Sequence, residues 1–291
     1  MLSYRHYFHA GNAADVFKHI ILIYCLEYMT KKEKALLCID THAGAGAYRL
    51  TQDRAENKEW KNGIGKLRAY VDSRESVEKF PAPVVRYLEL IQTFDGMYPG
   101  SPLLMGKFLR KQDRLVCFEL HPRDFEELQD SLNRTQDQAC AGKVPSIEIR
   151  KEDGPLSLKS LLPPRSRRGL IFVDPAWEEK DEYQVIPQTA AKALKRFPQG
   201  CYIIWYPLLI KPKVPLVTLR ETLFQLCHGK RCRLELYHSQ GEIEANSPRG
   251  MYGSGLIIYN PPWTLRPVLE EVLPFLSGVI GSGAWDLEWK E

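Results

Sequence analysis

The sequence lacks several features that would place the protein in a specialised class. It has no CxxC pair among its seven cysteines, no internal repeat and no low-complexity linker. The apolar run Ile20 to Leu26 is too short to span a bilayer, and Lys18, His19 and Glu27 flank it without a small-residue cleavage site. These absences predict an unprocessed cytoplasmic protein with reduced thiols, no metal site, no membrane segment and no separate second domain.

Composition and charge restrict the function only loosely. A chain of 291 residues that is 44% apolar can bury a full hydrophobic core. The net charge of +4 is modest, but basic residues gather in three clusters, each compatible with a solvated surface or with a phosphate-rich ligand. The clusters are Arg165 with Arg167 and Arg168; Lys230 with Arg231 and Arg233; and Arg5, His6, His9, Lys18 and His19.

Short apolar runs alternate with helix-like segments along most of the chain. This alternation predicts an α/β fold, a doubly wound and mostly parallel sheet with helices on both faces. The predicted helices are Ala13 to Thr30, Pro102 to Lys111, Arg123 to Asn133, Gln184 to Phe197 and Leu216 to His228. The seven predicted strands are Ala35 to Ile39, Leu115 to Phe118, Ser146 to Arg150, Gly169 to Val173, Cys201 to Trp205, Arg233 to Tyr237 and Gly255 to Tyr259.

Two parts of the chain depart from this alternation. The connection between the last two strands is polar and rich in glycine, which predicts a hairpin and an antiparallel final strand. About sixty residues separate the first strand from Ser101, more than an ordinary loop needs. Among them Val84, Tyr87, Leu88 and Ile91 have the spacing of an amphipathic helix. We therefore expect a single domain over residues 1–291 with a helical insertion at residues 48–97.

Acidic residues follow three successive predicted strands. The Gly-rich turn Asp40 to Gly46 follows the first strand, Glu119 the second, and Asp153 with Gly154 the third. Parallel strands end at one edge of the sheet, where open α/β sheets bind nucleotides. Gly44 allows a sharp turn beside a ligand. Glu119 can accept the ribose hydroxyl hydrogens, and Asp153 suits an adenine edge, so the recurrence predicts a nucleoside site.

The segment Tyr98 to Pro102 predicts the start of a helix. Ser101 has the properties of an N-cap, and Pro102 suits the first helical position. The N-terminus of a helix attracts anions, so it could bind the amino-acid carboxylate of S-adenosylmethionine.

The sequence Asp174-Pro175-Ala176-Trp177 follows the fourth predicted strand. The N6 amine of adenine is a weak nucleophile because its lone pair is delocalised into the ring. The Asp174 carboxylate and the Pro175 carbonyl could accept its two hydrogens, while Trp177 stacks on an extruded base. His19 and His42 could contact the cofactor or the base, or be ordinary structural histidines.

A second segment, Asn260-Pro261-Pro262-Trp263, is a closer literal match to the (N/D)PP(Y/F/W) pattern of amino-methyltransferases. It follows the last predicted strand, at the edge of the sheet, whereas a catalytic loop must follow the fourth strand beside the cofactor. We therefore interpret it as a structural exit turn.

Long motifs of this chain resemble the RlmJ family of 23S rRNA adenine-N6 methyltransferases. They are Met1 to Asn12 with Asp15, Lys18 and His19; Asp40 to Gly46; Tyr98 to Pro102; Glu119 to Pro122; Ser166 to Ile171; and Asn260 to Trp263. The resemblance implies a Rossmann-like methyltransferase that uses S-adenosylmethionine and acts on protein-free rRNA, at adenine 2030 of the large subunit. It implies cofactor contacts at His19, His42, Ser101, Glu119, Asp153, Gly154 and Asp174, with Asp174 also the catalytic acceptor and Tyr4 near the cofactor and target base.

The chain departs from the family pattern at one place. The family's DPPY reads Asp174-Pro175-Ala176-Trp177 here, so the loop loses one φ restraint while the acid, the first proline and an aromatic remain. Two alternatives stay open: the same transfer to adenine in DNA, and a non-catalytic nucleic-acid binding protein linked to the use of external DNA. We expect a monomer that needs no metal.

Overall fold

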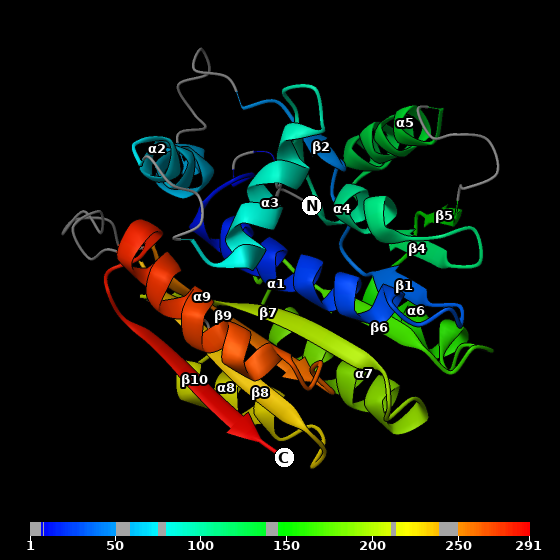
Figure 1. Ribbon diagram of the computed structural model, residues 1–291. Coiled ribbons are helices and arrows are strands. Elements are labelled where there is room, and N and C mark those ends of the chain that lie inside the picture. The colour runs from blue at the N-terminus through cyan, green and yellow to red at the C-terminus, as the bar shows by residue number, and fades with distance from the viewer. Residues whose placement is uncertain are drawn as a thin grey trace.

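The computed structural model describes residues 7, 9–50, 59–74, 80–137, 145–210, 214–238 and 250–291 (Figure 1). Tyr4, Arg5 and His6, which the resemblance or the charge pattern singled out, lie outside these ranges. Within the described ranges, no helix combines the length and apolar character needed to cross a membrane.

A single eight-stranded sheet runs through the molecule in the order β10-β8-β9-β7-β6-β1-β4-β5. The five strands from β5 to β7 are mutually parallel, and β9 is antiparallel to both β7 and β8. The predicted doubly wound sheet and the β8–β9 hairpin are therefore confirmed. The strands are β1 (Leu37–Asp40), β4 (Arg114–Phe118), β5 (Ser146–Arg150), β6 (Gly169–Val173), β7 (Cys201–Leu209), β8 (Arg231–Tyr237), β9 (Met251–Tyr259) and β10 (Trp285–Lys290).

The predicted number of seven strands is wrong, because β10 adds an eighth to this sheet. It pairs antiparallel with β8 at the edge of the sheet. Its sequence alternates apolar and polar residues and is only half-buried, whereas the central strands β1, β4, β6 and β7 contain continuous apolar runs. A search for apolar runs therefore passes over it.

Helices cover both faces of the sheet. In Figure 1, α1, α3, α4 and α9 lie in front of it and α6, α7 and α8 behind it. The bounds are α1 (Ala13–Thr30), α4 (Ser101–Phe108), α5 (Pro122–Asp137), α6 (Gly154–Leu161), α7 (Glu182–Arg196), α8 (Leu216–Phe224) and α9 (Leu265–Ile280). The sequence did not predict α6, which is short and begins Gly-Pro, or α9, which contains Pro274.

Three helical segments lie between two short strands, β2 (Ala47–Tyr48) and β3 (Tyr98–Pro99), which pair with each other. The segments are η2 (Lys61–Gly65), α2 (Lys66–Asp72) and α3 (Ala82–Gln92). The four residues that predicted an amphipathic helix are all buried on α3. This part of the chain packs on α1 and α9, so α1 is enclosed between the sheet and a second layer of helices.

Enclosure explains the composition of α1. Nearly every residue from Ala13 to Leu26 is buried, and most are apolar. Asp15, Lys18 and His19 are polar exceptions among these apolar residues, and they too are buried, with exposed fractions of at most 3%. Burial of charged groups is costly unless they are paired, so these residues indicate a built polar site. The sequence allowed Lys18 and His19, as members of the third basic cluster, to lie on a cationic surface. Both are buried, so they do not form part of such a surface.

Candidate active site

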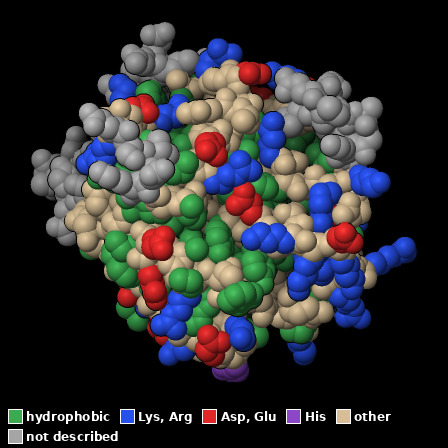
Figure 2. Space-filling view, viewed as in Figure 1, with side chains coloured by type: hydrophobic (Ala, Val, Ile, Leu, Met, Phe, Trp, Pro, Cys, Tyr) green, Lys and Arg blue, Asp and Glu red, His purple; other side chains and the backbone are tan. Residues whose placement is uncertain are grey.

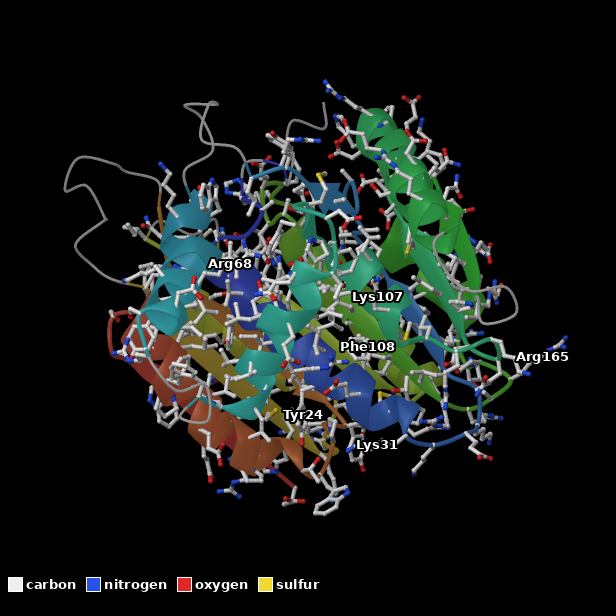
Figure 3. The ribbon with its side chains drawn as sticks, turned by 45° about the horizontal axis from the view of Figure 1, so that its top comes forward. Tyr24, Lys31, Arg68, Lys107, Phe108 and Arg165 are labelled. Atoms are coloured by element: carbon white, nitrogen blue, oxygen red, sulfur yellow. The ribbon has the colours of Figure 1, made fainter. Side chains whose placement is uncertain are left out.

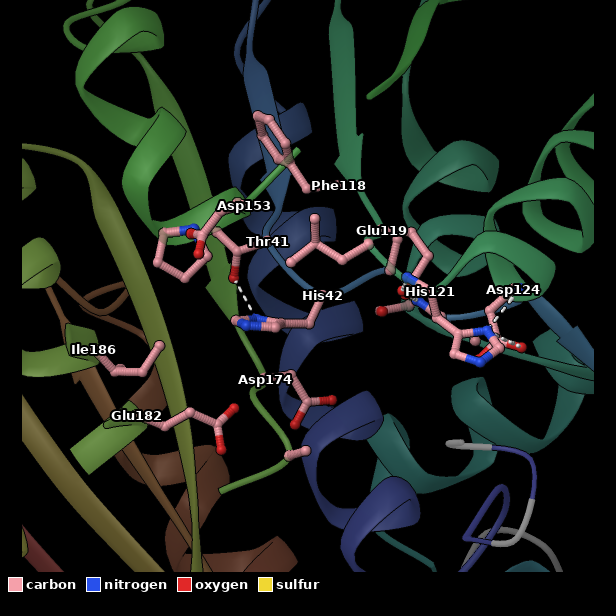
Figure 4. A pocket seen from close by; sticks show the side chains of 18 of the residues that line it. Thr41, His42, Phe118, Glu119, His121, Asp124, Asp153, Asp174, Glu182 and Ile186 are labelled. Carbon is pink, nitrogen blue, oxygen red and sulfur yellow. Dashed lines mark hydrogen bonds and ion pairs between the residues drawn. The ribbon is translucent and has the colours of Figure 1, made fainter. Parts of the chain in front are cut away.

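A cavity of about 290 Å³ lies beyond the carboxyl ends of β1, β4, β5 and β6 (Figure 4). Such an edge is where open parallel sheets bind their ligands. The structure brings all eight predicted cofactor residues to the wall of this one cavity: His19, His42, Gly44, Ser101, Glu119, Asp153, Gly154 and Asp174.

Asp40 is the fully buried acid at the end of β1. Its Oδ2 accepts a hydrogen bond from the Ser101 hydroxyl (2.6 Å) and its Oδ1 accepts one from the His42 backbone N–H (3.2 Å). Ser101 is therefore not the N-cap that the sequence predicted. Gly100 occupies that position, and Ser101 is the first residue of α4. The Ser101 hydroxyl instead fixes the Gly-rich turn against the start of this helix.

Burial raises the pKa of Asp40 from 3.8 to about 7, against the opposing effect of the Ser101 and His42 hydrogen bonds. The folded protein therefore holds this proton at pH values where the unfolded chain has lost it, and stability falls as pH rises from about 4 to 7. An Asp40→Asn variant lacks this dependence. We expect its free energy of unfolding, relative to wild type, to rise by about 2.5 kcal/mol between pH 5 and pH 7.5 in urea titrations. Parallel pH profiles would contradict the assignment.

Glu119 is held at the end of β4 by two backbone amides. The Gly44 N–H donates to its Oε2 (2.8 Å) and the His121 N–H to its Oε1 (2.7 Å). Gly44 has φ of 60°, the left-handed conformation that favours glycine. Burial raises the pKa of Glu119, while the two amide donors oppose that shift. The carboxylate is thus oriented at the cavity wall, where it can accept hydroxyl hydrogens.

Asp153 and Gly154 form the start of α6. The Asp153 side chain caps the helix by accepting from the Leu156 N–H at 2.9 Å. At Gly154 there is no room for a side chain, because an added Cβ would lie 2.2 Å from the Thr41 carbonyl oxygen. Gly154 therefore allows α6 to pack directly on the turn after β1.

We expect a Gly154→Ala variant to lose about 2 kcal/mol of stability or more, since the contact is with backbone atoms that cannot turn aside. Affinity for S-adenosylmethionine should fall with it, because α6 and the turn after β1 form adjacent parts of the cavity wall. Urea unfolding and calorimetric titration would measure the two effects. The matched control is Gly278→Ala, where no described atom outside the backbone of its own helix lies within 4 Å of the added methyl.

Asp174, at the end of β6, forms an ion pair with Lys18 of α1. The Lys18 Nζ lies 2.6 Å from Asp174 Oδ2 and 2.7 Å from Asp15 Oδ1. The Lys18 side chain is 4% exposed, and its ammonium lies 5.2 Å from the centre of the Trp205 ring. Burial opposes the charged ammonium, but the two carboxylates more than offset it and raise the pKa of Lys18. The helix thereby fixes the orientation of the Asp174 carboxylate.

His42 reaches into the cavity as a neutral acceptor (Figure 4). The Thr41 hydroxyl donates to the Phe172 carbonyl (3.1 Å), so the His42 Nδ1–H donates to the Thr41 Oγ1 (2.8 Å) and Nε2 is left with its lone pair. Burial lowers the pKa of His42 to about 3, which keeps the ring uncharged at neutral pH.

His19 connects the cavity to the segment between β2 and β3. Its Nδ1 lies 3.1 Å from the Tyr98 hydroxyl, which in turn lies 3.0 Å from the Tyr87 hydroxyl of α3. All three side chains are buried. One hydrogen-bonded chain therefore runs from α3 to the cavity wall.

Two members of the predicted catalytic loop do not line the cavity. Pro175 is buried, although no described donor bonds to its carbonyl oxygen. Trp177 is only 2% exposed; its Nε1–H donates to the Trp205 carbonyl (3.0 Å), and its ring packs edge-on against Tyr183. The predicted stacking of Trp177 on a base is incompatible with this conformation, because both faces of the ring are covered by protein. Ala176 lines the cavity instead.

The segment Asn260 to Trp263 lies at the opposite end of the sheet. Because β9 runs antiparallel to β7, it ends where β7 begins, and the Asn260 amide donates to the carbonyls of Pro198 and Gly200 (both 2.7 Å). This segment is therefore remote from the cavity, as predicted. The predicted place of this strand at the edge of the sheet is wrong, because β9 lies between β8 and β7; the direction of β9 is what carries the segment away from the cavity.

The charge of the residues that line the cavity can be compared with the charge of S-adenosylmethionine. Among the described residues that line it, seven are carboxylates and none is Lys or Arg. S-adenosylmethionine carries a sulfonium and an ammonium against one carboxylate, so its net charge is positive. The lining suits this cation and opposes a dinucleotide with its anionic pyrophosphate. The carboxylates are Glu119, Asp124, Glu152, Asp153, Asp174, Glu179 and Glu182.

Some residues of the site had no assigned role in the sequence. Leu120 is 42% exposed yet lines the cavity, where it offers an apolar surface beside Glu119. Glu182 and Ile186 reach the cavity from α7. The sequence did contain a signal for the role of Lys18. A Lys three residues after an Asp, on a helix that is otherwise largely apolar, implies a buried ion pair.

The strand order, the acids at successive strand ends and the acidic cavity define a Rossmann-like methyltransferase that uses S-adenosylmethionine. The family described as ribosomal RNA large subunit methyltransferase D, RlmJ, matches residues 33–291. The chain is 35% identical to ribosomal RNA large subunit methyltransferase J of Haemophilus influenzae and 36% identical to that of Escherichia coli, each over 99% of both chains. The chain belongs to the RlmJ family.

The fold agrees with a solved relative. A crystal structure of a Legionella pneumophila protein, 33% identical, superposes with a TM-score of 0.80 and covers 97% of this chain and 98% of that one.

Proposed function

We propose that the protein transfers the methyl group of S-adenosylmethionine to the N6 amine of an adenine in protein-free 23S rRNA, and that it acts as a monomer in the cytoplasm. The names of the two curated relatives support a large-subunit rRNA substrate. The observation that carries the proposal is the Asp174 carboxylate at the cavity wall, anchored through one oxygen by a buried ammonium at 2.6 Å.

The cofactor supplies an electrophilic methyl group on a sulfonium. Asp174 supplies an acceptor for the target amine. Its Oδ2 is held by Lys18, whereas no described residue donates to its Oδ1. Oδ1 is therefore available to accept one amine hydrogen, whereas Pro175, the second predicted acceptor, does not line the cavity. Localising the lone pair on N6 in this way makes the amine a better nucleophile.

The ion pair also limits how far the acceptor can move. A carboxylate fixed by a buried partner needs little reorganisation when an amine approaches, and such pre-orientation is a large part of enzymatic rate enhancement. His42 and Glu119 also line the cavity, as a neutral acceptor and an oriented carboxylate that hold the nucleoside of the cofactor.

The test compares nucleic acids and follows the product by mass spectrometry. The purified protein, incubated with S-adenosylmethionine and protein-free 23S rRNA, should form N6-methyladenine at a single position, and DNA of matched sequence should give much less. Preferential methylation of DNA would favour the first alternative. Cofactor binding without transfer to either polymer would favour a non-catalytic binding protein.

A further inference from the structure

The turn Asn260 to Trp263 presents a tryptophan that the methyl-transfer site does not use. Trp263 is 76% exposed, more than any other large hydrophobic side chain that the structure describes. It lies at the end of the sheet opposite to the cavity, and a five-residue strand such as β6 spans about 17 Å between these ends. An RNA strand bound at the cavity is long enough to extend over this distance to Trp263.

The turn that carries Trp263 is fixed from both sides. Asn260 has φ of 50°, a conformation held by the hydrogen bonds of its amide to Pro198 and Gly200. On the other side, the Tyr24 hydroxyl of α1 donates to the Thr264 hydroxyl oxygen at 2.8 Å. An exposed indole on a rigid turn loses little conformational entropy when a planar ligand stacks on it.

A shallow hollow of about 270 Å³ adjoins this indole. Its wall includes Trp263, Pro262 and Gln199, together with Tyr28 and Met29 of α1. An aromatic ring, a phenol and an amide around one hollow offer a stacking surface and hydrogen-bonding groups. This chemistry suits an unpaired nucleobase.

Cations lie next to the hollow. Tyr24, Tyr28 and Lys31 are spaced i, i+4 and i+7, so they share one face of α1 as it ends. The loop that follows is fixed by two half-buried guanidinium groups. Arg110 donates to the carbonyls of Thr30 and Lys32 (both 2.7 Å), and Arg168 donates to those of Met29 and Lys34.

The side chains of this loop remain available to a ligand. Lys31, Lys32 and Lys34 are exposed, as are Arg165 and Arg167 beside Arg168. None of these five forms an ion pair with a described carboxylate, and Glu33 is the acid within the loop. Figure 2 shows blue side chains gathered at the lower right of this face, and Figure 3 places Lys31 at the end of α1 with Arg165 on a neighbouring loop.

The second predicted basic cluster offers a contrast. Arg231 is 7% exposed, and Arg233 pairs with Asp286 (3.0 Å) and Glu288 (3.1 Å). Arg233 is therefore neutralised within the fold, and Arg231 is buried beneath the surface. The cluster around the end of α1 is not neutralised in this way, so it attracts phosphates.

We propose that Trp263 and the cations Lys31, Lys32, Lys34, Arg165 and Arg167 form a second RNA-binding surface, which holds a single-stranded segment away from the target adenine. One base stacks on the Trp263 indole and the adjoining phosphates lie against the cations. The inference extends the proposed function, because it gives the same RNA a second point of attachment.

A probe without adenine separates this surface from the methyl-transfer site. Fluorescence anisotropy measures the binding of a labelled oligouridine of about twenty nucleotides, longer than the site of one binding module. We expect Trp263→Ala to weaken binding roughly five- to fiftyfold, the loss of one base-aromatic stack, and Trp263→Phe to retain most of it. In the Lys31→Ala/Lys32→Ala/Lys34→Ala variant the slope of log K against log salt should fall by about 2.

The matched control is Trp285→Ala, because Trp285 pairs with Leu236 at the other end of the sheet. It should bind oligouridine like the wild type. Wild-type affinity and salt slope in the Trp263→Ala and triple-lysine variants would overturn the inference, and so would an equal loss in Trp285→Ala. Because the probe holds no adenine, failure of the methyl-transfer proposal would leave these results unaffected. With 23S rRNA, Trp263→Ala should raise KM and leave kcat unchanged.

Discussion

Asn in place of Asp174 should reduce the rate of methyl transfer about a thousandfold. The Lys18 ammonium requires an oxygen at 2.6 Å, so the Asn side chain turns its carbonyl toward Lys18 and its NH₂ toward the target amine. Two donors then face each other, and the amine loses its acceptor. Single-turnover transfer of radiolabelled methyl to 23S rRNA measures the effect.

Two measurements support the interpretation of that experiment. Calorimetric titration with S-adenosylmethionine shows whether the variant still binds the cofactor, and thermal unfolding shows whether it is folded. A folded Asp174→Asn variant that methylates within threefold of the wild-type rate would show that another group accepts the amine hydrogens.

Replacing Lys18 with Met should have the largest effect on stability. The change leaves two carboxylates, Asp15 and Asp174, in the interior without the cation that both contact. Removing one partner of a buried ion pair costs about 3–5 kcal/mol, because the remaining charge is uncompensated. Urea unfolding at neutral pH measures the loss.

A matched control exists on the same helix. Lys31 is exposed at the end of α1, so Lys31→Met should change stability by less than about 0.5 kcal/mol. Adding Asp15→Asn to Lys18→Met should restore part of the lost stability, since one uncompensated charge is removed. No recovery in the double variant would indicate that packing of the lysine stem, rather than charge, dominates.

The parallel part of the sheet and the cavity wall could be predicted from the sequence for a physical reason. The central parallel strands are continuous apolar runs, and the carboxyl ends of all parallel strands meet at one edge, so Asp40, Glu119, Asp153 and Asp174 converge there. A half-exposed edge strand such as β10 gives no such run. Its pairing depends on β8, which is remote in sequence.

Side-chain direction was the part that sequence reasoning could not reach. Trp177 has the right residue type at the right place, yet its φ of 56° turns the indole into the core. Ser101 has the composition of an N-cap, yet its hydroxyl bonds to Asp40, a residue 61 positions away. Both outcomes depend on tertiary contacts that local pattern does not encode.

The enclosure of α1 has a consequence for synthesis of the protein. This helix leaves the ribosome long before α9, which covers part of it. Until α9 has been made, an apolar surface along α1 has no permanent cover. Assembly of this half of the molecule must therefore wait for the synthesis of α9, and a nascent chain stalled before α9 is exposed to aggregation.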